Sequence, residues 1–140
     1  MVLADGTGTP LGIHVEKASP AAGTLLEPTL KAGRIGDRRV KRRKPKRLIA
    51  DRGYDRKAAR ALLVKHDLEP IIPARSNNHV ATHQDGRKLR RDKHRWVIER
   101  TNAWLQNFRR LVVRYERSAK NVTALVHVAC ALTTLKRVSG

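Results

Sequence analysis

The stretch Leu48-Ile49-Ala50-Asp51-Arg52-Gly53-Tyr54-Asp55 decides the fold of this chain. A short apolar run ends at an acid and a glycine, and apolar residues at helical spacing resume from Ala58. This order predicts a strand, a tight turn and a helix, with Asp55 as the N-cap of that helix. The segment Pro70 to Pro73 predicts a second short strand, which its prolines keep near a sheet edge. A strand, a helix and a strand in succession favour an α/β fold with parallel pairing.

Upstream of this unit, the sequence predicts a β-hairpin and a short helix. Val2 to Ala4 and Leu11 to Val15 are the two arms, and the Asp-Gly pair that follows the first arm is typical of a hairpin turn. We interpret Asp5 as a former of that turn. Ser19-Pro20 has the pattern of a helix N-cap followed by proline, and predicts a helix that ends before Gly33.

Downstream, the sequence predicts two long helices. Apolar residues from Val97 to Tyr115 recur at helical spacing and indicate one long amphipathic helix. Ser118 to Asn121 interrupts this pattern, and Val122 to Leu135 predicts a closing helix that packs against the first. We therefore expect a single α/β domain over residues 1–140, with a short mixed sheet, an N-terminal hairpin and two long C-terminal helices.

The charge of the chain limits its function. Its 140 residues include 31 Lys plus Arg and 12 Asp plus Glu, a formal net charge of +19 at pH 7. An ordinary metabolic enzyme has no need of this excess, whereas binding of Lys and Arg to phosphates releases counterions and gives strong association. The charge concentrates in an expected basic loop, about residues 33–47, and at the end of an expected mobile loop, about residues 74–90. Nucleic acid is the leading partner, although a solvated basic loop without a partner remains an alternative.

The single cysteine and the lack of long apolar runs bear on location. Cys130 excludes an internal disulfide, which fits a reducing compartment. The longest mostly apolar stretch, Val122 to Leu135, is too short to span lipid. We expect a cytoplasmic protein with no membrane partner.

Two acids in this basic chain are candidates for chemistry. Asp51 follows a predicted strand, where open α/β sheets bind ligands, and Glu99 lies on the predicted long helix. Each also has a purely structural alternative: Asp51 could hydrogen-bond its own turn, and Glu99 could pair with Arg95 one helical turn earlier. Together, two such carboxylates could hold Mg²⁺ or Mn²⁺ beside phosphates.

These segments carry a resemblance to a known family. The stretch 48–55, followed by His94 to Leu105 and Phe108 to Leu111, resembles the catalytic region of bacterial insertion-sequence DDE transposases. The resemblance implies an RNase H-like core in which two Asp and one Glu bind two divalent metal ions, cut transposon ends and join them to target DNA. By resemblance, Asp51 is the second Asp and Glu99 is the Glu, and both are catalytic metal ligands.

The resemblance also implies which cations contact DNA. Arg95 matches the arginine of the family's helix signature, and Gln106 stands where a Lys or Arg is usual, so we assign that phosphate contact to Arg109 and Arg110. We expect the two carboxylates to converge on a basic surface. The expected DNA-binding residues are Arg52, Arg91, Lys93, Arg95, Arg109 and Arg110.

The family places its first catalytic Asp on a core strand that precedes the hairpin, and this chain begins at the hairpin. Asp5 is the one candidate substitute for that residue, but the residues after it continue as the family's non-catalytic turn does, which favours the turn role. We therefore expect an incomplete RNase H-like domain, truncated at the N-terminus and inactive alone, which could pair with a missing N-terminal part or form a homodimer. The alternative is a non-catalytic basic protein of ribosomal type that binds nucleic acid. Convergence of Asp51 and Glu99 would favour the transposase.

Overall fold

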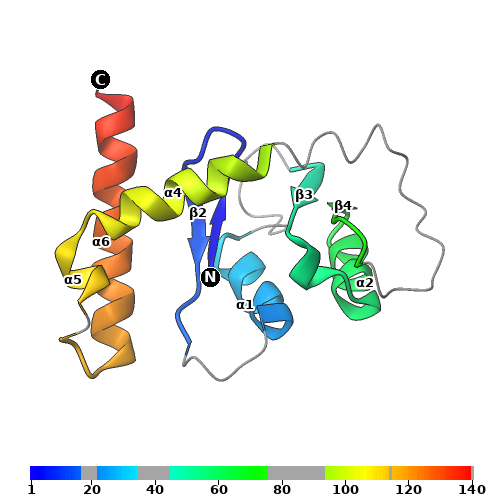
Figure 1. Ribbon diagram of the computed structural model, residues 1–140, viewed down its shortest axis with the longest axis horizontal. Coiled ribbons are helices and arrows are strands. Elements are labelled where there is room, and N and C mark those ends of the chain that lie inside the picture. Colours follow the sequence, from blue (N-terminus) through cyan, green and yellow to red (C-terminus); the bar gives the residue numbers. More distant parts are fainter. Residues whose placement is uncertain (17–21, 35–44, 76–93, 114, 140) are drawn as a thin grey trace.

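Figure 1 presents the computed structural model, which describes residues 1–16, 22–34, 45–75, 94–113 and 115–139. Strands and helices follow one another in an α/β arrangement, and α6 forms one end of the molecule in this view (Figure 1). The elements are β1 (Val2–Ala4), β2 (Pro10–Ile13), the 3-10 turn η1 (Ala22–Leu25), α1 (Leu26–Ala32), β3 (Arg47–Ile49), the 3-10 turn η2 (Arg52–Tyr54), α2 (Lys57–Lys65), β4 (Glu69–Ile71), α4 (Trp96–Gln106), α5 (Arg109–Val112) and α6 (Ala119–Val138).

The strands pair as the sequence predicts, but in two sheets. β1 and β2 form an antiparallel hairpin in which Val2 lies opposite Ile13. β3 and β4 are parallel, with Leu48 opposite Pro70. The hairpin and the parallel strand–helix–strand unit are thus confirmed. The expected single mixed sheet is wrong for the described residues, because no ladder of hydrogen bonds joins the hairpin to β3.

Two apolar clusters hold these elements together, one on each side of the hairpin. The first comprises Leu26, Leu30, Leu48, Ala59, Leu63, Leu68 and Ile72. The second comprises Ile13, Leu105, Ala129 and Cys130. Successive strand residues point to opposite faces, so Leu3 packs against the first cluster and its neighbour Val2 against the second. The hairpin therefore connects the β3–α2–β4 unit to the C-terminal helices.

The prediction of one long helix over residues 97–115 is wrong. α4 ends at Gln106, and Phe108 adopts an extended backbone (φ −85°, ψ 105°) before the short helix α5. This bend lets Phe108 and Leu111 pack against the second cluster. Tyr115, which the periodicity places on the apolar face, is 79% exposed. Packing against α6 thus overrides the helical pattern, and α6 is the one long C-terminal helix of the described residues.

Several smaller predictions concern where helices and loops begin and end. α1 ends at Ala32, as predicted, but Ser19 and Pro20 lie outside the described residues. Of the expected basic loop, residues 35–44 are outside the described residues, and Arg47 belongs to β3. Most of the expected mobile loop, from residue 76 onward, is also outside them. No helix in the described part of the chain is long and apolar enough to cross a membrane.

Candidate active site around Asp51

Asp51 lies in the turn that follows β3, with its side chain exposed to solvent. Its Oδ1 accepts a hydrogen bond from the Gly53 amide at 2.7 Å, so the turn-forming role is confirmed for that oxygen. Oδ2 has no hydrogen-bond partner among the residues that the structure describes. A carboxylate with one oxygen oriented by its own turn and the other exposed to water can coordinate a cation that prefers oxygen ligands, such as Mg²⁺.

Asp55, four residues later, is buried instead of capping α2. Only 6% of the residue is exposed, and Arg56 is the N-cap, without a side-chain hydrogen bond. The Oδ1 atom of Asp55 accepts hydrogen bonds from Nε and Nη2 of Arg60 at 3.0 and 2.8 Å, and Oδ2 accepts one from the Arg75 amide at 2.8 Å. The N-cap prediction is therefore wrong, because the ion pair with Arg60 and the hydrogen bond from the Arg75 amide use the carboxylate oxygens that a cap would need.

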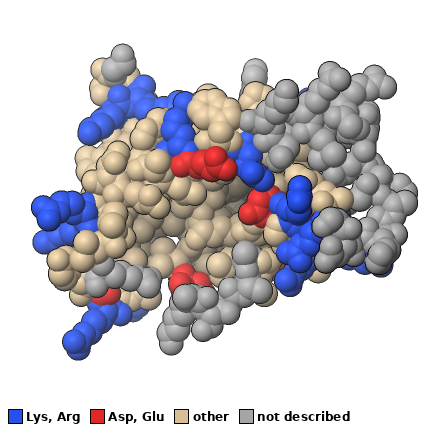
Figure 2. Space-filling model, in the orientation of Figure 1, with Lys and Arg blue, Asp and Glu red and all other residues tan. Residues whose placement is uncertain are grey.

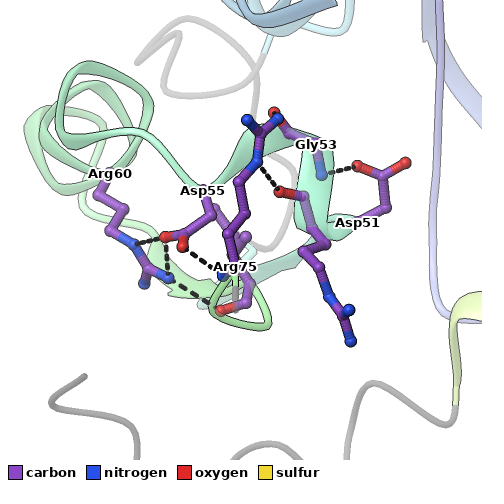
Figure 3. A network of polar contacts seen from close by, with 7 residues as sticks. Asp51, Gly53, Asp55, Arg60 and Arg75 are labelled. Carbon is purple, nitrogen blue, oxygen red and sulfur yellow. Dashed lines mark hydrogen bonds and ion pairs between the residues drawn. The ribbon is translucent and has the colours of Figure 1, made fainter. Parts of the chain in front are cut away.

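Arg75 joins this buried acid to the turn that carries Asp51. Its Nε donates to the Arg52 carbonyl and its Nη2 to the Gly53 carbonyl, each at 3.1 Å. Figure 3 shows the Asp51 carboxylate pointing away from Asp55, Arg60 and Arg75. Sequence reasoning missed Arg75, because it lies beyond β4 and no local spacing relates it to residue 51.

Tyr54 completes the turn as a half-buried packing residue. Burial, and then the nearby negative charge of Asp51, raise the pKa of the Tyr54 phenol above its ordinary value. The phenol contacts the Met1 sulfur at 3.7 Å. Tyr54 therefore stays protonated at neutral pH and anchors the turn to the N-terminal strand.

Glu99, the second candidate ligand, is exposed on α4. Its Oε1 lies 3.6 Å from Nε of Arg95, and the two side chains are 65% and 41% exposed. The helical ion pair foreseen as the structural alternative is thus present, but such exposed pairs contribute only about 0.3–0.5 kcal/mol. Glu99 therefore presents an exposed carboxylate, and its convergence with Asp51 stays a prediction. Among the described residues, no group of three or more His, Cys, Asp or Glu is placed to hold a metal ion.

The expected DNA-binding residues are spread over separate elements. Arg52 lies in η2 and Arg95 directly precedes α4, whereas Arg109 and Arg110 lie exposed in α5. Because α4 ends at Gln106, the two α5 arginines do not lie on the helix that carries Glu99. Arg91 and Lys93 lie outside the described residues. On the face drawn in Figure 2, the acidic groups are few, and basic side chains border most of them.

Asp5 behaves differently from Asp51, although it too sits in a glycine-containing turn. Its Oδ1 accepts hydrogen bonds from the Thr7 amide (2.9 Å), the Thr7 hydroxyl (2.7 Å) and the Thr9 amide (2.8 Å). Partial burial raises the pKa of Asp5, but the hydrogen bonds from Thr7, Thr9 and Gly8 together lower it below the ordinary value. The interpretation of Asp5 as a turn former is confirmed.

Comparison with known proteins now defines the class of this chain. A family model described as "Transposase DDE domain" matches residues 1–134. A Burkholderia cepacia protein described as "Putative transposase for insertion sequence element IS402" is 37% identical over 141 residues, which cover 97% of this chain and 63% of that protein. The chain therefore belongs to the transposase DDE domain family, and spans less than two thirds of the length of this relative. No solved structure matches the chain.

Proposed function

We propose that this chain is a catalytic region of an insertion-sequence transposase, which cuts and joins DNA by metal-dependent phosphodiester chemistry. The observation that carries the proposal is the exposed Asp51 carboxylate, which follows β3 and keeps Oδ2 uncommitted among the described residues. Family membership supports it. An antiparallel hairpin followed by a parallel strand pair also supports an RNase H-like core, which we include in the proposal.

Asp51 and Glu99 are the proposed ligands of Mg²⁺ or Mn²⁺. Both present exposed carboxylate oxygens, the donors that these ions prefer. When bound, such ions stabilise charge on the attacking and leaving oxygens of a phosphodiester. The part of this chain is to hold Asp51 in a fixed turn and Glu99 on a helix, so that both ligands are oriented before DNA arrives.

DNA is the proposed partner. The net charge of +19 favours phosphate binding, and Arg52, Arg95, Arg109 and Arg110 offer exposed or half-exposed guanidinium groups. Arg91 and Lys93 belong to the same proposal. Since the described residues gather no three-ligand group, we propose that a second copy or a separate segment completes the site. DNA cleavage by the 140-residue chain alone is then expected to be undetectable.

The test is a titration of the whole chain with Mn²⁺, in which electron paramagnetic resonance measures the concentration of free ion. Asp51→Asn and Glu99→Gln are each expected to weaken binding about tenfold or more, because each removes a charged oxygen ligand. Glu116→Gln, which removes an acid outside the site, is the matched control and should bind as the parent does. Equal Mn²⁺ affinity in the parent and in both site variants would contradict the proposal.

The non-catalytic alternative receives no support from the comparisons, and duplex-DNA binding alone does not separate it from the transposase. Both functions predict affinity that falls steeply with salt. If the chain acts as a transposase, however, the residues that bind Mn²⁺ and the residues that contact DNA form one site. Arg109→Gln is expected to reduce the salt slope by about one, whereas the control Arg117→Gln leaves the slope unchanged. A flat salt response of the parent would remove DNA as the partner.

A further inference from the structure

We infer that Arg75 is a positioning residue for Asp51: its guanidinium fixes the turn of residues 51–54 so that the Asp51 carboxylate keeps one orientation. The inference rests on the proposed function, because orientation matters only if Asp51 binds a ligand. It assigns a role to a residue that the metal-ligand and DNA-binding sets leave out.

The contacts run from Arg75 to Asp51 through two successive peptide groups of the turn. Nε and Nη2 of Arg75 donate to the adjacent carbonyls of Arg52 and Gly53, each at 3.1 Å. Two donors in the rigid fork of one guanidinium fix two successive peptide groups at once, which a flexible ammonium cannot do. The Gly53 amide, within the same short segment, donates to Asp51 Oδ1 at 2.7 Å. Fixing these peptides therefore fixes the donor that orients the carboxylate.

The backbone of Arg75 is itself held by a buried carboxylate. Its amide donates to Oδ2 of Asp55, whose side chain is only 3% exposed. Arg60 binds the other oxygen of Asp55 and also donates from Nη2 to the Ile72 carbonyl at 2.9 Å. Figure 3 shows these groups as one connected network, with Arg75 reaching from Asp55 across to the turn. The exposed turn is thus attached to α2 and to the segment that follows β4, both of which contribute residues to the first core cluster.

The glycine at position 53 adds an independent geometric observation. A Cβ atom on residue 53 would lie 2.8 Å from Oδ1 of Asp51. The carboxylate and the Gly53 backbone are thus in close contact, and a small movement of this peptide displaces the carboxylate. A turn this tight benefits from a second support on its carbonyl side, which Arg75 provides.

The experiment compares Arg75→Gln and Arg75→Lys with Arg117→Gln, the control that removes an exposed arginine elsewhere. Amide hydrogen exchange of Gly53, measured by NMR, is expected to accelerate about tenfold in Arg75→Gln, because hydrogen bonds to a charged donor are lost. Mn²⁺ affinity should fall several-fold, with the melting temperature equal to that of the control. Arg75→Lys keeps the charge but not the fork, so it should resemble Arg75→Gln.

The outcomes separate this inference from the proposed function. Unchanged Gly53 exchange in Arg75→Gln would overturn the positioning role, and so would full rescue by Arg75→Lys, since charge alone would then suffice. If Asp51→Asn binds Mn²⁺ as the parent does, the proposed function fails, while faster Gly53 exchange still supports the attachment of the turn by Arg75. A salt slope for DNA that falls in Arg75→Gln while Gly53 exchange stays unchanged would make Arg75 a phosphate contact instead, and would also overturn the inference.

Discussion

The hairpin turn of residues 5–9 and the turn of residues 51–55 both contain an aspartate and a glycine, but they hold the aspartate differently. In the hairpin turn, Asp5 Oδ1 accepts three hydrogen bonds from residues of its own turn. In the later turn, Asp51 Oδ1 accepts one. The Asp5 carboxylate is thus held by more donors of its own turn and is partly buried, whereas the Asp51 carboxylate is held by a single amide and is exposed. The number of donors and the exposure of each carboxylate together favour Asp51 over Asp5 as the candidate metal ligand.

Both turns are supported by side chains from distant segments, but through different chemistry. The hairpin turn is held by α4, where the Thr101 hydroxyl donates to the Gly8 carbonyl at 2.9 Å and Arg100 donates to the Thr7 carbonyl at 2.8 Å. The guanidinium of Arg100 stacks between Trp96 and Trp104, 4.6 and 4.8 Å from their ring centroids. The turn of residues 51–55 is held by the Arg75 side chain, and the Arg75 amide is in turn bound by the buried Asp55 carboxylate. The hairpin turn is thus held by side chains of α4, and the turn of residues 51–55 by a network of hydrogen bonds that includes the Asp55–Arg60 ion pair.

The largest effect is expected for Asp55→Ala, which removes the support of the later turn. Breaking a buried pair leaves Arg60 and the Arg75 amide without their acceptor, and should lower the free energy of unfolding by about 3 kcal/mol. Urea unfolding measures this loss, and Glu116→Ala is the control for removing a more exposed acid. A loss below about 1 kcal/mol, the range of surface pairs, would mean that the network does not stabilise the turn.

The next effect concerns the hairpin turn, through Gly8→Ala. Gly8 has φ +91°, and a Cβ there would lie 2.9 Å from Oγ1 of Thr101, so the substitution adds backbone strain and a collision with a buried hydroxyl. We expect a loss of about 2 kcal/mol in unfolding free energy. Gly6→Ala is the matched control in the same turn, since its Cβ would meet nothing within 4 Å. Equal losses for the two variants would remove the proposed contact with α4 as the cause.

A smaller and pH-dependent effect is expected for Asp5→Ala. The lowered pKa of Asp5 means that its carboxylate stabilises the folded state above the ordinary pKa of 3.8, and that this contribution disappears as the pH falls through the lower folded value. At pH 7 the loss should be about 1 kcal/mol, as for other turn and cap acids. Unfolding curves of both proteins at pH 7 and near pH 2 measure it. A difference that persists at the acidic pH would contradict a role for the ionised form.

The smallest effect on stability is expected for Gly53→Ala, although its effect on the proposed site is large. The new Cβ would lie 2.8 Å from Oδ1 of Asp51, an exposed side chain that can rotate away, so unfolding free energy should change by less than about 1 kcal/mol. Mn²⁺ binding should nevertheless weaken several-fold, because the carboxylate is reoriented. A stability loss as large as that of Gly8→Ala would erase the distinction between the two turns.

Local pattern predicted the elements near the site well and their long-range partners poorly. Strand β3, the turn at Asp51 and helix α2 follow from an apolar run, an Asp-x-Gly sequence and helical spacing, all within a few residues. The helix over residues 97–115 was predicted too long because periodicity does not reveal the bend at Phe108, where the chain packs against a cluster that includes residues of α6. Asp55 was predicted as a cap because the local spacing shows neither its burial nor the amide of Arg75, 20 residues away, that binds it together with Arg60.

By itself, the sequence determined the hairpin, the parallel strand–helix–strand unit, the strongly basic character and the family resemblance, since each depends on residue type, short spacing or summed charge. Only the tertiary structure decided which acid is buried and which is exposed, where the long helix bends, and which arginine supports the turn at Asp51. The physical reason is that burial, the bend at Phe108 and the contacts of Arg75 arise between segments that the chain brings together only on folding, so no local pattern of residues encodes them.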